Sequence, residues 1–172
     1  MQDDLSDFKL SAKTKAKLKN EKLLKKELEK GKTAQEIMGF SDKAMAKFYQ
    51  AAYFLFEHKR YQDAADAFLF LATLNPHHHE YWLGIGMATQ MCQDYDAAID
   101  AYELAALCNI ISPVPYFYLA KCLFAIHERD SALQALDLAI DTADDLDEYS
   151  ELKRQAEMAK QMILKHGTGN EG

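Results

Sequence analysis

Residues that interrupt helices are scarce in this sequence, because its 172 residues include only three prolines and seven glycines. A chain with so few breakers can be helical over most of its length. No apolar run approaches the roughly 18 residues that a membrane-spanning helix needs. The acidic, polar start MQDDLSDFKL differs from a secretory signal peptide. We therefore predict an all-α protein that does not insert into membranes.

Cysteine is also rare, with Cys92, Cys108 and Cys122 widely spaced along the chain. An odd number of distant cysteines argues against a disulfide framework. Each stands among apolar neighbours, so we interpret all three as reduced, buried packing residues of a cytosolic protein.

Charge is distributed unevenly along the chain. Residues 9–32 carry ten lysines against three glutamates, whereas residues 33–172 carry ten lysines and arginines against 21 acidic residues. An acidic body argues against nucleic acid as the main partner. The basic stretch is interpreted as a solvated helix or arm, with contact to nucleic acid or to a membrane surface as the alternative.

A period of 34 residues relates three segments of the chain. It superimposes large residues, small residues and aromatic residues on their own kind. The matching sets are Phe48, Trp82 and Tyr116; Ala52, Gly86 and Ala120; Ala64, Ala98 and Ala132; and Phe68, Tyr102 and Leu136. This period and spacing resemble the tetratricopeptide repeat, in which each unit is a pair of antiparallel helices.

The small residues have a physical role in such a repeat, since they allow paired helices to approach closely. Gly86 is thus expected to lie at a helix contact, despite the roughly 1 kcal/mol that glycine costs inside a helix. A nucleotide-binding turn at Gly84-Ile85-Gly86 is rejected, because no strand precedes it and the third glycine of the motif is replaced by Thr89.

The repeat predicts a solenoid of three helical hairpins within residues 41–165. The units span about 45–78, 79–112 and 113–146, with helices at 45–58, 61–74, 79–92, 95–108, 113–126 and 129–142. A further amphipathic helix at 148–165 is expected to cap the stack, followed by a disordered tail at 166–172. Residues 1–40 form a basic helical arm, in which Thr33 with Glu36 is predicted as a capping box. Ser41 is predicted as the next N-cap.

Residue types used in catalysis or metal binding do not gather at useful spacings. His77, His78 and His79 are adjacent, and no cysteine or carboxylate stands at ligand spacing from them, so we expect a loop that leads into a helix rather than a metal site. The acidic run at 141–151 lacks the glycine and spacing of a calcium loop. We predict neither enzymatic activity nor a cofactor.

The first helix of each hairpin should line the hollow side of the stack. Positions 2, 5, 9 and 12 of each unit face that hollow. They are Ala46, Tyr49, Tyr53 and Phe56; Glu80, Leu83, Met87 and Gln90; and Val114, Phe117, Lys121 and Phe124. Such an apolar surface predicts a groove for an apolar peptide. The alternative is that the N-terminal segment covers these residues as part of the core.

Several long stretches resemble a known family. They include KFYQAAYFLFEHKRYQDAADAF, YWLGIGMATQMCQDYDAAIDAYELA with its continuation to residue 139, and EYSELKRQAEMAKQMI. Over about residues 36–163 the chain resembles the class II chaperones of bacterial type III secretion, the tetratricopeptide chaperones of translocator proteins. The lysine-rich arm is longer and more basic than is usual in that family.

This resemblance implies a cytosolic bacterial protein that keeps hydrophobic translocators soluble before export, and that forms a homodimer when free through its N-terminal region. A one-to-one complex with the client is also compatible. By position, Tyr49, Tyr53, Phe56 and Tyr61 match the family's groove aromatics. Two alternatives stay open. One is a chaperone for another secretion substrate, such as a gatekeeper. The other is a tetratricopeptide adaptor, whose groove would need lysine and asparagine to bind a carboxylate.

Overall fold

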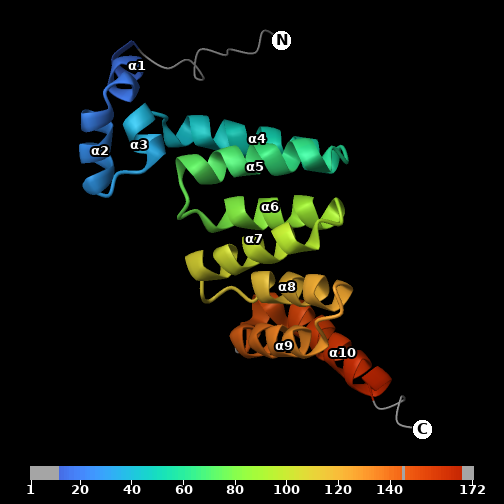
Figure 1. Ribbon diagram of the computed structural model, residues 1–172. Helices are drawn as coiled ribbons and strands as arrows, with labels where there is room; N and C mark the ends of the chain where they lie inside the picture. Colours follow the sequence, from blue (N-terminus) through green and yellow to red (C-terminus); the bar gives the residue numbers. More distant parts are fainter. Residues whose placement is uncertain (1–11, 145, 168–172) are drawn as a thin grey trace.

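The N-terminal region begins the fold with three short helices. The structure, a computed structural model, describes residues 12–144 and 146–167. Helices α1 (Ala12–Lys19) and α2 (Glu21–Glu29) fall within the predicted basic arm, and α3 (Ala34–Met38) follows them. Helix α1 packs against α2 and α3, so this region stands to one side of the main stack (Figure 1).

Three helical hairpins follow in chain order and stack on one another (Figure 1). Their helices are α4 (Asp42–Glu57), α5 (Tyr61–Leu74), α6 (His79–Met91), α7 (Tyr95–Cys108), α8 (Val114–Ala125) and α9 (Arg129–Ala143). Every boundary agrees with the predicted one to within three residues. The 34-residue period therefore predicted these helices correctly.

Local capping signals set the start of the stack. The side-chain oxygen of Thr33 accepts a hydrogen bond from the Glu36 amide, and the Thr33 amide donates to the Glu36 carboxylate at 2.7 Å. The Ser41 hydroxyl oxygen accepts from the Ala44 amide at 3.1 Å. Gly39 ends α3 with a φ of 75°, a left-handed conformation that glycine adopts without strain. These predicted capping interactions are confirmed.

Close helix contacts explain the two glycines of α6. A Cβ atom on Gly86 would lie 2.6 Å from the ring of Tyr102, and one on Gly84 would lie 2.5 Å from the ring of Phe68. Both rings are almost fully buried. The predicted contact role of Gly86 is confirmed, and the structure adds the same role for Gly84. Each of these aromatic rings packs directly on the backbone of α6.

The C-terminal end of the stack is closed by α10 (Ser150–Gly167), which follows the short 3-10 helix η2 (Asp147–Tyr149). Helix α10 packs mainly against α9, burying Ala156 and Ile163. The helix includes His166 and Gly167, which the sequence analysis had assigned to the tail. Residues 168–172 lie outside the described residues.

The prediction that all three cysteines are buried was wrong for one of them. Cys122 is buried and Cys108 is half-buried, but Cys92 is exposed. Cys92 is the C-cap of α6, where the chain leaves the packed face to turn toward α7. Across the described residues, no helix combines the length and apolar character needed to cross a membrane.

Candidate peptide-binding groove

Two adjoining hollows lie along the first helices of the hairpins. The first has a volume of about 340 Å³ and lies between the α3–α4 region and the start of α6. The second has a volume of about 420 Å³ and extends from α4 across α6 to α8. Tyr49 and Glu80 line both hollows. We refer to the two hollows together as the groove.

A row of aromatic rings borders the groove on α4. Ring centroids are 6.4 Å apart for Tyr49 and Tyr53, 6.3 Å for Tyr53 and Phe56, and 5.4 Å for Phe56 and Tyr61. Tyr49 and Tyr53 line the groove, whereas Phe56 and Tyr61 continue the row beyond it. Tyr53 is 41% exposed, so its ring offers free apolar surface next to a rigid aromatic neighbour.

Tyr49 joins this row to the core. Its ring lies 5.7 Å from that of Phe68 and 6.0 Å from that of Tyr81. Burial, with a smaller contribution from Glu80, raises the pKa of Tyr49 above its ordinary value. Tyr49 therefore remains a neutral phenol at physiological pH, able to donate one hydrogen bond to a ligand.

Helix α6 supplies the floor of the second hollow. Leu83 and Met87 line it, and Leu83 is only 8% exposed. Gln90 lines neither hollow, and its side-chain oxygen accepts a hydrogen bond from the Tyr102 hydroxyl at 2.7 Å. This bond satisfies the hydroxyl of a ring that the α6–α7 contact buries. Gln90 thus has a structural partner within its own hairpin.

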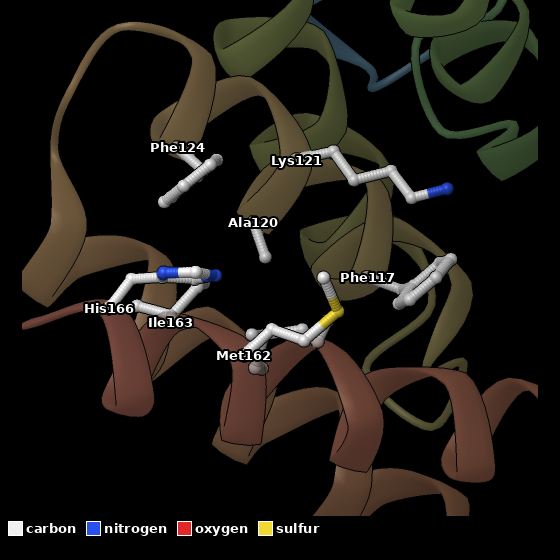
Figure 2. Close-up of a pocket in the computed structure, with 9 residues that line it drawn as sticks. Phe117, Ala120, Lys121, Phe124, Met162, Ile163 and His166 are labelled. Atoms are coloured by element: carbon white, nitrogen blue, oxygen red, sulfur yellow. The ribbon is translucent and has the colours of Figure 1, made fainter.

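Of the four predicted residues of α8, Val114 lines the second hollow and the other three line a different cavity. Phe117, Lys121 and Phe124 line a space of about 370 Å³ between α8 and α10, the α8–α10 pocket (Figure 2). The Lys121 ammonium lies 4.4 Å from the ring centroid of Phe117 and 5.0 Å from that of Tyr118. Burial lowers the pKa of Lys121, while the aromatic faces attract its charged form.

Two tyrosines that were not predicted to face the hollow also line the groove. Tyr118 lines the second hollow from α8, and Tyr149 lines it from η2, outside the repeats. Tyr118 occupies the repeat position of Gly84, which is not one of the positions predicted to face the hollow. Its ring stacks on Tyr102 at 5.8 Å, so the same aromatic layer serves both the core and the groove.

Two of the three adjacent histidines make separate contacts. The His79 ring nitrogen Nδ1 lies 2.7 Å from the Ala105 carbonyl oxygen, and the His78 ring stacks on Tyr81 at 4.1 Å. Within residues 12–144 and 146–167, no three histidine, cysteine or acidic side chains are grouped so as to hold a metal ion. The groove instead combines aromatic surface with a few polar groups, which suits an extended apolar peptide.

Known proteins are similar to this chain in sequence. No protein-family model matches the chain. The chain is 30% identical to low calcium response locus protein H of Yersinia pestis over 139 residues, which cover 80% of this chain and 83% of that protein. It is 23% identical to the chaperone protein SicA of Salmonella typhimurium over 115 residues, covering 67% of this chain and 70% of SicA.

Solved structures agree in fold. The type III secretion chaperone SycD of Yersinia enterocolitica, solved with a peptide of the translocator YopD, aligns with a TM-score of 0.71 and 27% identity, covering 74% of this chain and 97% of SycD. A type III secretion complex from Aeromonas hydrophila aligns with a TM-score of 0.82 at 21% identity, covering 87% and 100%. At that identity, the similarity to the Aeromonas complex concerns the fold alone.

Together with the Yersinia pestis relative, these findings confirm the predicted tetratricopeptide-like fold and the predicted class of chaperone rather than enzyme. The chain belongs to the family of class II translocator chaperones of type III secretion.

Proposed function

We propose that this protein binds an extended apolar segment of a translocator in the groove and keeps the translocator soluble before export. The observation that carries this proposal is the aromatic groove on a fold shared with SycD, which was solved with a translocator peptide. Tyr53 and Met87 offer exposed or partly exposed apolar surface there. Such surface gains stability when a partner covers it.

The groove chemistry disfavours the adaptor alternative. An adaptor for an acidic C-terminus needs cationic side chains that pair with carboxylates. No lysine or arginine is among the described residues that line either hollow, and Glu80 lines both. The α4 residues that line the second hollow are Tyr49 and Tyr53. A peptide that is apolar where it meets these rings fits better than a free carboxylate.

Co-purification from the native cytosol tests this function. The full-length protein is isolated with whatever remains bound, and the bound proteins are identified by mass spectrometry. We expect a translocator, retained by the wild type and by Phe54→Ala and reduced in Tyr53→Ala. If a gatekeeper is recovered instead, and its recovery also depends on Tyr53, the client is a gatekeeper rather than a translocator. Recovery of a partner that does not depend on Tyr53 would contradict the assignment of the groove as the client-binding site.

We also infer that the free protein is a homodimer in the bacterial cytoplasm, with its N-terminal region at the interface. A dimer of SycD has been solved at 28% identity to this chain. Helices α1 and α2 stand apart from the stack (Figure 1), and Leu28 on α2 is 51% exposed. Covering such a residue in a symmetric contact would stabilise the pair.

A further inference from the structure

The α8–α10 pocket is apolar and open to solvent in the free protein. Phe124 of α8 is 53% exposed and Met162 of α10 is 59% exposed. Ala120 and Ile163 form its inner wall (Figure 2). Its volume of about 370 Å³ is at the lower end of the range of about 300–1,000 Å³ for ligand pockets. This size suits one or two apolar side chains.

Among the described residues that line this pocket there is one lysine, Lys121, and no carboxylate. Lys121 borders one side, with its ammonium toward Phe117, and His166 stands at the other end beside Phe124 (Figure 2). Arg129 donates a hydrogen bond to the carbonyl oxygen of Ile163 at 3.1 Å. None of these three side chains forms an ion pair with a carboxylate of the described residues.

Arg129 does not line the pocket, but it holds the inner wall through its hydrogen bond to Ile163. Its Nε atom is buried and has no hydrogen-bond partner among the described residues, an arrangement that is uncommon for a buried donor. An anionic group that binds at the mouth of the pocket would be attracted by the Lys121 ammonium.

The pocket also continues from the groove along one helix. Val114 and Tyr118 of α8 line the groove, and Phe117 and Lys121 of the same helix line the pocket. Because residues three or four apart on a helix are neighbours, Lys121 lies beside Tyr118, and its ammonium contacts that ring. A peptide that leaves the groove over Tyr118 therefore arrives at Lys121.

We infer that the α8–α10 pocket is a second anchor site for the client, which receives a large apolar side chain while a nearby carboxylate of the same peptide pairs with Lys121. This inference rests on the proposed function, since it assumes that a peptide occupies the groove. The recognised chemistry is an acidic residue within about two positions of a leucine, isoleucine, methionine or phenylalanine. The groove and the pocket then bind different residues of the same client peptide.

Peptide selection on the full-length protein tests the inference without a known client. Phage-displayed peptides of 12 residues are selected on the wild type, and the best binder is synthesised with a fluorescent label. Such a peptide spans about 40 Å when extended. We expect the selected peptides to combine an apolar residue with a neighbouring Asp or Glu. Their dissociation constants are measured by fluorescence anisotropy.

Two variants test separately how the charge of Lys121 and the apolar pocket contribute to peptide binding. Lys121→Met keeps the aliphatic stem and removes the ammonium, and Met162→Glu places a carboxylate in the pocket. Each should weaken peptide binding about tenfold. Replacing the peptide's acid by its amide should weaken binding to the wild type about tenfold but to Lys121→Met less than twofold. Lys43→Met and Leu164→Glu, at sites that do not line the pocket, should change binding less than twofold.

The outcomes distinguish failure of the pocket from failure of the groove. Binding that Tyr53→Ala weakens but Lys121→Met and Met162→Glu leave unchanged would overturn the second anchor and retain the proposed function. Binding that none of these variants weakens would overturn both. If decanoate binds the wild type but not Met162→Glu, and peptide binding is indifferent to both, the pocket is a fatty-acid site and the inference fails. Thermal unfolding of each variant verifies that it is folded.

Discussion

Replacing Tyr53 by alanine removes the most exposed aromatic ring that lines the groove. The ring contacts Tyr49 and Phe56 within α4, and 41% of the residue is accessible to solvent. The loss in folding stability should be below about 2 kcal/mol, since complete burial of an aromatic side chain is needed for the larger cost of about 3–5 kcal/mol. Tyr53→Ala should therefore remain folded.

The effect on client binding follows from the surface that a peptide would cover. An aromatic side chain offers on the order of 200 Å², of which the exposed 41% is about 80 Å². At about 25 cal/mol per Å², covering this surface contributes roughly 2 kcal/mol. The dissociation constant of the client peptide should accordingly increase about thirtyfold. Binding costs that the wild type and the variant share cancel in this comparison.

Phe54 provides a matched control on the same helix. It is 57% exposed and its ring contacts His58 at 3.9 Å, but it lines neither hollow. Isothermal titration of the client segment identified by co-purification should give a thirtyfold weaker affinity for Tyr53→Ala and an unchanged affinity for Phe54→Ala. Equal affinities for both variants and the wild type, with both variants folded, would refute the groove assignment.

Three further predictions concern packing, titration and assembly. Ala98 is completely buried, so Ala98→Leu should lower the free energy of unfolding by about 1–3 kcal/mol, whereas Ala51→Leu at an exposed site should change it by less than about 0.5 kcal/mol; urea denaturation measures both. Burial raises the pKa of the Cys122 thiol from 9.0 to about 11, so its contribution to stability is present below pH 9 and is lost as the pH rises toward 11. Over that range the unfolding free energy of the wild type should fall by about 2–3 kcal/mol more than that of Cys122→Ala, and parallel slopes would contradict this. Light scattering should show a dimer for the full chain and a monomer for a chain that begins at Lys32, and an unchanged dimer would place the interface elsewhere.

The sequence alone determined the helices and their order, because the signals involved are local or strictly periodic. Thr33 and Ser41 mark helix starts through hydrogen bonds to amides three residues away. The 34-residue spacing places Gly86 and Tyr102 on facing helices, and the structure brings them into direct contact. Repetition of these positions was sufficient to predict each hairpin and the close helix contact at Gly86.

The tertiary structure decided what each helix face meets. Gln90 occupies a repeat position that faces the hollow, yet it accepts a hydrogen bond from Tyr102 because that buried hydroxyl needs an acceptor within reach. Lys121 and Phe124 line a pocket against α10 rather than the groove. A repeat position specifies the face of a helix on which a residue lies. The neighbour of that face at the end of the stack is a single non-repeated helix, and only its packing shows what space remains.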